Sequence, residues 1–460
     1  MSSTRGPSRR DLLIGAAGGA IAAAAEAGIY AGFRGSAHVS GPAGLDQPYI
    51  LGRSTSDLPA GLVRADVRAF KKGSDSDYHN AFTEALTAAE AVYVPPGTLH
   101  VSQGITLPAN RVIYADGGLD QRQTASRSGA VIQLTNDIGP GALLSLGTGC
   151  EIRGLTVDAD GKADKALAIP QGSDECRIWD TKAQNGRSCA FFGDGSRHTI
   201  IGCVFEALPN TGLYAYYCSG ADLHVVAVRM IGGVKAAGWV NGFYGDYEIV
   251  HFQGSSATQN SGLVTRNHNH FVQCRFDGSV GPNLLVQSKG NKFVSCRFYQ
   301  GRPGKTSSAV RIDGGSGIAS LNEFVAVYTD AVSEHTWDLL LEIIGSAENT
   351  AGTILTSGSC SQCKGVFNTR PAEVGLVTNS AGLRSRNEFQ TALSGNGQTR
   401  FTMAHRLLAA PASVVVVPAS GDAASSPFHV TSDAANVILV YQAPPPSGSG
   451  NLVYNVVAMM

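Results

Sequence analysis

A repeated motif limits the folds open to this chain more than any other feature of the sequence. The segments Asn269–Phe276 and Asn291–Phe298 share the pattern Asn-x-Phe-Val-x-Cys-Arg-Phe at an offset of 22 residues. Weaker copies that keep Asn-x-Phe begin at Asn322 and Asn387. The apolar-x-apolar ending of the motif recurs earlier in the chain, starting at Cys176, Cys203, Val228 and Val250. The steps from Cys176 to Cys296 vary between 22 and 27 residues, which favours a solenoid whose turns are joined by loops of variable length.

The spacing inside the motif predicts strands rather than helices. Phe271 and Cys274 are three residues apart, which breaks the alternation of a strand, whereas Cys274 and Phe276 keep it. A sharp turn between two short strands would let all three side chains point inward. The sequence therefore predicts an all-β fold, a right-handed parallel β-helix with turns about 4.8 Å apart. Leucine-rich repeats have a similar length, but their Leu-x-x-Leu-x-Leu core is missing.

The chain has nine cysteines, and several occupy the inward position of the motif. Cys176, Cys203, Cys274 and Cys296 are expected to be buried thiols that act as small hydrophobic side chains. Cys360-Ser-Gln-Cys363 could form a strained disulfide, half of a metal site or neither. A zinc site would need a second cysteine pair at ligand spacing, which the sequence lacks.

Composition excludes one class of partner. The chain has 460 residues, of which 15% are charged and 56 are glycine, as in a β-rich protein dense in turns. Lys and Arg number 35 against 36 Asp and Glu, so the formal charge is −1. Without a global basic field, nucleic acid is not an expected partner.

Residues 1–37 are expected to be an export signal. Arg9-Arg10 precedes an uncharged run from Leu12 to Ala25, and Ala25-Glu26-Ala27 or Gly35-Ser36-Ala37 could be cleaved. The segment resembles a twin-arginine signal, which implies bacterial export of a folded protein to an extracytoplasmic or secreted location. The run is short and weakly apolar for a membrane span, so the mature form is expected to lack a membrane anchor. Residues 38–62 are expected to be a linker.

The next segment is expected to cap the solenoid, which spans residues 63–395. Val67–Phe70 is predicted as a strand and Asp77–Ala91 as a helix with Phe82, Leu86 and Ala89 on one side. Val92-Tyr-Val94-Pro95-Pro96-Gly97-Thr98 then resembles the opening of the pectate lyase superfamily and of tailspike proteins. The resemblance implies that the helix covers the open end of the β-helix, although the family's Gly-Asp-Gly-x-x-Asp-Asp segment is degraded to residues 73–77.

Residues 396–460 change in character. Short apolar runs alternate with clusters of Pro, Gly and Ser, which predicts a small C-terminal β-sandwich. It resembles domains that follow tailspike β-helices and that support trimers or sugar contacts. A homotrimer is therefore one expectation for the assembly, and glycan binding is another expectation for this domain.

Two columns of outward side chains are expected to contact a ligand. The first alternates with the inward positions of the motif and holds substrate-binding candidates Arg229, His251, Arg275 and Arg297. Guanidinium groups bind carboxylates and sulfates bidentately, so this column suits an acidic polysaccharide. The alternative is a solvated face whose arginines pair with Glu206 and Asp277.

The second column follows an earlier strand of each turn, where the groove of pectate lyase-like proteins usually lies. Its catalytic candidates are three carboxylates, a guanidinium and a phenol, and its binding candidates are an amide and a second guanidinium. The catalytic set is Asp194, Asp246, Asp313, Arg266 and Tyr216, and the binding set is Gln287 and Arg311. Hydrolysis needs two carboxyl groups flanking the bond, and β-elimination needs a base beside a group that neutralises a uronate. A slip of one residue in register would invert each assignment.

No metal or other cofactor is expected. Asp158-Ala-Asp160-Gly could be a weak calcium loop, but such a segment is more often a turn. His268 and His270 flank Asn269 in the motif, which favours a structural position over a metal site. The polygalacturonase set of Asn-Thr-Asp, Asp-Asp, Gly-His-Gly and Arg-Ile-Lys is absent.

The leading hypothesis from the sequence is an exported β-helix that cleaves a polysaccharide by hydrolysis or β-elimination. The alternative is a non-catalytic surface protein, tailspike-like or otherwise, that binds glycans or assembles through its C-terminal domain. Fold alone does not decide between them.

Overall fold

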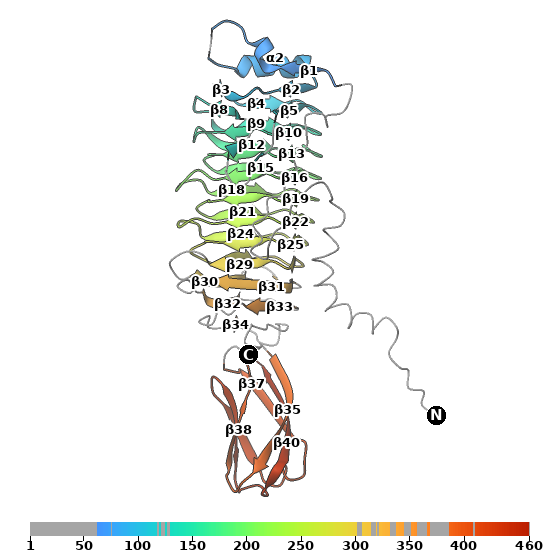
Figure 1. Cartoon of the computed structure of the whole chain (residues 1–460), viewed down its shortest axis with the longest axis vertical. Helices are drawn as coiled ribbons and strands as arrows, with labels where there is room; N and C mark the ends of the chain where they lie inside the picture. Colours follow the sequence, from blue (N-terminus) through green and yellow to red (C-terminus); the bar gives the residue numbers. More distant parts are fainter. Residues whose placement is uncertain are drawn as a thin grey trace, which may run out of the picture. The chain divides into compact units, whose positions relative to one another are not determined.

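The structure, a computed structural model, is a parallel β-helix followed by two small antiparallel sheets at the C-terminal end of the chain (Figure 1). It describes residues 62–460 except 75, 117–118, 121–124, 127–128, 301–305, 314–318, 320–321, 332–336, 345–350, 357–365, 369–385, 408–409 and 460. The predicted export signal, most of the linker and Cys360-Ser-Gln-Cys363 lie outside these residues. Among the described residues, no helix has both the length and the apolar character needed to cross a membrane.

Each complete turn of the solenoid contains three strands, which stack into three faces. Face 1 is an 11-stranded sheet in which every strand pairs in parallel with the equivalent strand of the next turn. Its strands are β4 (Ile105–Leu107), β9 (Gly139–Leu146), β12 (Ala163–Ile169), β15 (Cys189–Gly193), β18 (Tyr214–Cys218), β21 (Ala236–Val240), β24 (Asn260–Val264), β27 (Leu284–Val286), β30 (Thr306–Asp313), β32 (Trp337–Ile344) and β34 (Val366–Asn368).

Faces 2 and 3 belong to one 21-stranded sheet that bends between them. Face 2 contains β1 (Arg64–Asp66), β2 (Ala91–Tyr93), β5 (Val112–Tyr114), β10 (Glu151–Arg153), β13 (Arg177–Trp179), β16 (Thr199–Ile201), β19 (His224–Val226), β22 (Asp246–Glu248), β25 (His270–Val272) and β28 (Lys292–Val294). Face 3 contains β3 (Gly97–Val101), β8 (Ala130–Leu134), β11 (Thr156–Asp158), β14 (Lys182–Gln184), β17 (Val204–Glu206), β20 (Arg229–Ile231), β23 (His251–Gln253), β26 (Arg275–Asp277) and β29 (Arg297–Gln300). The long strand β31 (Glu323–Ala331) continues both faces and pairs with β33 (Ala351–Thr356), and β6 (Leu119–Asp120) pairs with β7 (Ala125–Ser126) outside them.

A left-handed residue makes the corner between faces 2 and 3. Gln273 and Ser295 have φ of 53° and 51°, and Ala227 and Ile249 occupy the same position two turns and one turn before Gln273. A single residue in this conformation reverses the alternation of the strand. This corner explains why Phe271 and Cys274, three residues apart, both point inward, as the sequence predicted.

An asparagine ladder ties successive turns together at the entrance to face 2. The Asn269 and Asn291 backbone N–H groups donate to the Oδ1 atoms of Asn291 and Asn322, each at 3.0 Å, and all three side chains are fully buried. Each amide therefore satisfies a backbone donor of the turn before it. This is the physical reason for Asn-x-Phe in the motif.

The solenoid interior contains stacked aromatic rings and buried thiols. Phe271, Phe293 and Phe324 stack with ring centroids 4.7 and 4.8 Å apart. Cys274 and Cys296 are fully buried and lie in equivalent positions one turn apart. Burial raises the pKa of the Cys176 and Cys218 thiols to about 12, so these two remain protonated. The buried cysteines act as small hydrophobic side chains, as predicted.

The N-terminal cap is confirmed with shorter bounds than predicted. The first segment forms a 3₁₀ helix, η3 (Val67–Phe70), where a strand was predicted, and the helix α2 runs from His79 to Ala88. Phe82 and Leu86 join the hydrophobic core of the first turns, and Figure 1 shows α2 over that end of the solenoid. Asp77 accepts hydrogen bonds from the His79 and Ser102 backbone N–H groups, both at 3.0 Å, so this residue of the degraded segment is structural.

The C-terminal domain is the predicted β-sandwich. One sheet contains β35 (Arg386–Gly395), β40 (Gly448–Met459) and β37 (Ser413–Pro418), and the other contains β36 (Arg400–Ala404), β39 (Asn436–Tyr441) and β38 (Phe428–Ser432). Both sheets contribute to one core, in which Phe401, Leu439, Tyr454 and Val456 are buried. The antiparallel pairing begins at Arg386, and the domain boundary predicted at residue 396 stays a prediction.

Two copies of the motif were placed wrongly from the sequence. Asn387 lies in the antiparallel strand β35 and donates to the His405 carbonyl, so it is no part of the ladder. Cys176 precedes a strand of face 2, whereas Cys203 precedes a strand of face 3. Both thiols are buried, but they occupy different columns because short apolar-x-apolar strands occur on both faces.

Replacing Asn291 by Ala tests the ladder. The change leaves the buried Asn269 N–H without an acceptor, which should lower the free energy of unfolding by about 2 to 3 kcal/mol. A lower guanidinium midpoint measures this loss. The control Asn267→Ala removes an acceptor for the Lys289 N–H in an exposed corner and should cost much less. Equal losses for the two variants would contradict the role of the ladder.

Candidate functional site

The structure sorts the predicted arginine column onto face 3 and confirms its register. Arg229, His251, Arg275 and Arg297 pair in this order along β20, β23, β26 and β29. Their side chains therefore point to the same side of successive turns, about 4.8 Å apart. The alignment of these four residues in one column is thus confirmed. Their role in binding stays a prediction.

The side chains of this column contact other outward residues of face 3, namely Gln253, Asp277 and Tyr299. The Asp277 carboxylate lies 3.0 Å from both His251 Nε2 and an Arg275 nitrogen. Arg229 donates to Gln253 Oε1, and the Arg275 and Arg297 guanidinium groups lie 4.7 and 5.7 Å from the centre of the Tyr299 ring. The arrangement matches the alternative of a paired face more closely than an open row of cations, although Glu206 pairs with Lys182 instead of an arginine.

Burial affects two groups of the column. It lowers the pKa of His251, and the neighbouring Asp277 opposes that shift. Burial also lowers the pKa of Arg229, again opposed by the Asp277 charge. His251 and Arg229 are therefore partly buried among their neighbours, and a ligand on face 3 would contact side chains that are already packed.

Only some residues of the second predicted column lie together on face 1. Asp194 and Gln287 directly follow the face 1 strands β15 and β27, and Asp313 is the last residue of β30. These strands are in register, and Arg311 lies within β30. Asp246 lies instead on face 2, where its carboxylate is 3.8 Å from His270. Arg266 lies in the turn after β24, with its guanidinium 5.3 Å from the centre of the Phe243 ring. Asp246 and Arg266 therefore do not belong to this column.

Tyr216 points into the solenoid, so its prediction as an outward catalytic residue is wrong. The side chain is fully buried and stacks on Phe191 with centroids 5.2 Å apart. Burial raises the pKa of its hydroxyl well above the usual value. The error is a slip in register, because Phe191 pairs with Tyr216 and not with Ala215.

The predicted aspartates cannot act as one carboxylate pair. Five strand pairings separate Asp194 from Asp313, which places them about 24 Å apart at 4.8 Å per turn. Paired carboxylates in glycosidases lie roughly 5 to 10 Å apart. The arrangement of acids predicted for hydrolysis is therefore not formed by these residues.

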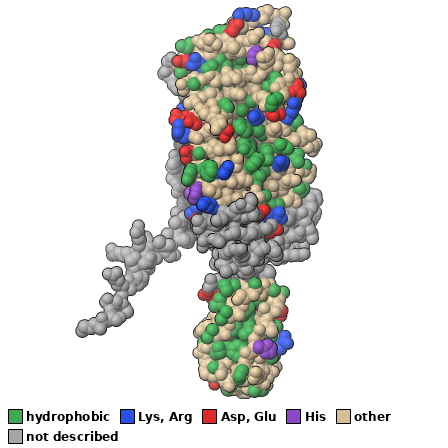
Figure 2. All heavy atoms as spheres, turned by 180° about the vertical axis from the view of Figure 1, so that it is seen from behind, with side chains coloured by type: hydrophobic (Ala, Val, Ile, Leu, Met, Phe, Trp, Pro, Cys, Tyr) green, Lys and Arg blue, Asp and Glu red, His purple; other side chains and the backbone are tan. Residues whose placement is uncertain are grey.

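What the sequence reasoning missed is an apolar strip on face 1. Phe192, Tyr217, Trp239, Leu263 and Leu285 pair in this order along β15, β18, β21, β24 and β27. All five side chains are half-buried and point away from the core of the solenoid. Hydrophobic side chains gather over the middle turns on the side of the molecule that Figure 2 shows. The strip is about 19 Å long, since it crosses four turns.

Aromatic rings are packed at one end of the strip. Phe192 and Tyr217 stack with centroids 5.3 Å apart and planes at 9°, and the Trp239 ring meets Tyr217 edge-on at 4.7 Å. Tyr214 packs behind them, 5.0 Å from Trp239. Lys165 places its ammonium group 4.5 Å from the centre of the Phe192 ring. These contacts hold the rings in fixed orientations before any ligand arrives.

A polar column runs beside the apolar strip. It consists of Asp194, Ser219, Asn241, Thr265 and Gln287, whose backbone N–H groups continue the parallel ladder of face 1. Trp239 Nε1 donates to Thr265 Oγ1 at 2.7 Å, and Asn241 Nδ2 donates to the Tyr217 hydroxyl oxygen at 3.2 Å. Ser219 Oγ donates to Asp194 Oδ1. The strip and the polar column together form an amphipathic surface of the kind that binds sugars, whose rings have apolar and hydroxyl-bearing sides.

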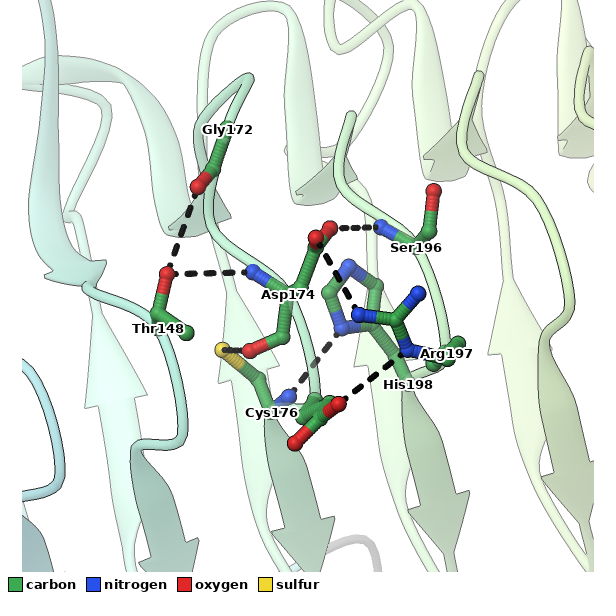
Figure 3. Close-up of polar contacts among 8 residues, drawn as sticks. Thr148, Gly172, Asp174, Cys176, Ser196, Arg197 and His198 are labelled. Atoms are coloured by element: carbon green, nitrogen blue, oxygen red, sulfur yellow. Dashed lines mark hydrogen bonds and ion pairs between the residues drawn. The ribbon is translucent and has the colours of Figure 1, made fainter.

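A polar corner between faces 1 and 2 is structural (Figure 3). Asp174 accepts from the Ser196 N–H at 2.8 Å and lies 3.4 Å from Arg197, which also donates to Glu175 at 3.2 Å. The buried His198 accepts from the Cys176 N–H through Nδ1 at 3.2 Å. Its contacts join one turn to the previous one, so we assign this cluster to the fold.

No metal site emerges from the described residues. They contain no group of three or more His, Cys, Asp or Glu side chains that could hold an ion. Asp158 accepts from the Asp160 N–H and from the amides of Gln184 and Asn185 at 2.8 to 2.9 Å, as in a turn. His268 stacks on Tyr244, whereas His270 approaches Asp246 on face 2.

Comparisons with known proteins find similarity only among solved structures. No protein-family model matches the chain, and no curated protein matches it. ORF18 of Geobacillus virus E2 aligns with a TM-score of 0.47 and 14% identity over 84% of this chain and 79% of that chain. The A-module of mannuronan C-5 epimerase AlgE6 from Azotobacter vinelandii gives 0.46 and 12% over 68% and 97%. Tailspike protein 2 from the Escherichia coli O157:H7 bacteriophage CAB120 gives 0.45 and 10% over 88% and 63%.

Protonation of His198 should destabilise the fold. Burial lowers its pKa from 6.5 to about 4, and Nδ1 must stay unprotonated to accept from Cys176. The unfolded chain binds the proton near pH 6.5, so stability is lost as the pH falls from 6.5 toward 4, by about 3 kcal/mol at most. Denaturant titrations at pH 7 and pH 4.5 should show a smaller difference for His198→Gln than for the original protein. The same difference in both would contradict the assignment.

Proposed function

We propose that this protein is a carbohydrate-active β-helix protein that binds a polysaccharide along face 1. The observation that carries the proposal is the apolar strip from Phe192 to Leu285 with the polar column at its side. Aromatic rings that are half-exposed and prepacked offer flat surfaces to the C–H side of a sugar ring. A contiguous row of partly exposed apolar side chains on a folded domain supports a binding surface.

The geometry of the solenoid supports a polymer as the ligand. Equivalent side chains recur about every 4.8 Å, which is comparable to the length of one sugar residue. A chain lying across the strands would therefore meet a similar pair of apolar and polar groups at each turn. A small isolated ligand would leave most of the strip unused.

Cleavage of the bound chain is the finer part of the proposal, and it rests on Asp194. This half-buried carboxylate stands at the aromatic end of the strip and accepts from Ser219, so it could serve as an acid or base toward a sugar that stacks on Phe192 and Tyr217. Hydrolysis and β-elimination are both retained as reaction types. Non-catalytic binding is the alternative, and it is favoured by the lack of a second carboxylate of the predicted set near Asp194.

Replacing Trp239 by Ala tests binding. The change removes the largest side chain of the strip and should weaken binding by about tenfold or more, equivalent to at least 1.4 kcal/mol. Affinity electrophoresis in gels containing single polysaccharides measures the effect. The matched control is Trp179→Ala, which removes a half-buried tryptophan from face 2. Equal retardation of both variants and the original protein by a bound polysaccharide would contradict the site.

Asp194→Asn separates cleavage from binding. If the protein cleaves its ligand, the variant should bind with similar affinity but lose turnover by at least about a hundredfold, because the acid or base is removed. New reducing ends with absorbance near 235 nm indicate elimination, and reducing ends without it indicate hydrolysis. Full turnover in the variant would rule out Asp194, and binding without products in the original protein would establish the non-catalytic alternative.

Export and assembly complete the proposal. Residues 1–37 are proposed to direct twin-arginine export, and the sandwich from Arg386 onward is proposed to hold copies together as a homotrimer. The observation that favours self-association is β37, an edge strand that leaves Val415 and Val417 half-exposed. Light scattering of the mature chain should give three times the monomer mass, and Val415→Lys should reduce it. A monomeric mature chain would contradict the trimer.

A further inference from the structure

The polar column of face 1 is uncharged over four consecutive turns. Ser219, Asn241, Thr265 and Gln287 carry only hydroxyl and amide groups. The acidic members of the column, Asp194 before Ser219 and Asp313 after Gln287, stand at its two ends. A polysaccharide with a carboxylate on each residue would lie beside hydroxyls and amides and then approach a like charge.

The hydrogen bonds of this column prepare it for neutral hydroxyl groups. Thr265 Oγ1 accepts from Trp239 and donates to Asn241 Oδ1 at 2.7 Å, so its proton is used. Asn241 donates one of its two amide protons to the Tyr217 oxygen. Among the described residues, these bonds use neither the Tyr217 hydroxyl proton nor the second Asn241 amide proton, so both donors remain for a ligand. Such single neutral donors match sugar hydroxyl oxygens.

The described cations nearest to face 1 already contact other side chains of the protein. Arg311, the guanidinium nearest in register to the strip, donates to Glu342 Oε2 at 2.7 Å. Lys165 and Arg266 lie over the Phe192 and Phe243 rings at the margins of face 1. The row of arginines lies on face 3 and contacts Asp277, Gln253 and Tyr299. Among the described residues, none of the four turns from Ser219 to Gln287 therefore places a cation in the apolar strip or the polar column.

From this chemistry we infer that the glycan bound along face 1 is a neutral polysaccharide, with about four uncharged sugar residues covering the strip. The inference rests on the proposed function and specifies its ligand class. It replaces the acidic polysaccharide expected from the arginine column. Recognition comes from ring stacking and neutral hydrogen bonds, so affinity depends little on ionic strength.

The test compares neutral and acidic oligosaccharides on the full mature chain. Isothermal titrations use hexamers of β-1,4-glucose, β-1,4-mannose and α-1,4-glucose against hexamers of galacturonate and mannuronate, at about 20 and about 500 mM NaCl. We expect a neutral hexamer to bind, with affinity changed less than about twofold by salt and reduced about tenfold by Trp239→Ala. The uronate hexamers should bind at least about tenfold more weakly.

Two further variants make the outcome decisive. Tyr217→Phe removes only the hydroxyl and should weaken neutral binding about threefold to tenfold without disturbing the stack. Gln287→Arg adds a cation at an exposed position of the polar column and should create binding of a uronate hexamer that is lost at high salt. Trp239-dependent binding of uronates by the original protein would overturn the neutral ligand while leaving the proposed function intact. Trp239-independent binding, or no binding of any hexamer, would overturn both.

Discussion

The parallel stacking of backbone turns is the constraint on which the rest of this structure depends. Each strand of the solenoid satisfies its hydrogen bonds through the turns before and after it, so one residue of slip would displace a whole side chain ladder. The buried asparagine ladder and the stacked phenylalanines fix this register from inside. The outer surface inherits the same register, which is how residues more than 90 positions apart come to form one strip.

Parallel stacking also allows faces 1 and 3 to carry side chains of different chemical character. Face 3 carries arginines that pair with Asp277 and stack on Tyr299, whereas the strip and polar column in the middle turns of face 1 carry apolar side chains and neutral polar groups. A single turn of chain contributes to both faces, for example through Arg229 and Trp239. The charged surface and the proposed binding surface therefore share one scaffold without sharing side chains.

The fold could be predicted from the sequence because the repeated residues of the motif are the buried ones. Asn-x-Phe and Cys-x-Phe recur where amides and rings stack, and their spacing required the corner that Gln273 and Ser295 make. The site was harder to predict, since outward residues are not constrained to repeat. The strands of face 1 carry adjacent aromatics such as Tyr216 and Tyr217, and alternation alone does not say which of the two is buried. The register of Phe191 with Tyr216 decides it, and that register was not visible in the sequence.

The central claim is that a glycan lies on the apolar strip of face 1. Since the chain has three tryptophans, a variant with Trp179→Phe and Trp337→Phe keeps Trp239 as its sole indole fluorophore. Titration of this variant with a polysaccharide that it binds should change the Trp239 emission in a saturable manner and with the same dissociation constant as calorimetry. Binding by calorimetry with no change in Trp239 emission would place the ligand elsewhere and contradict the account.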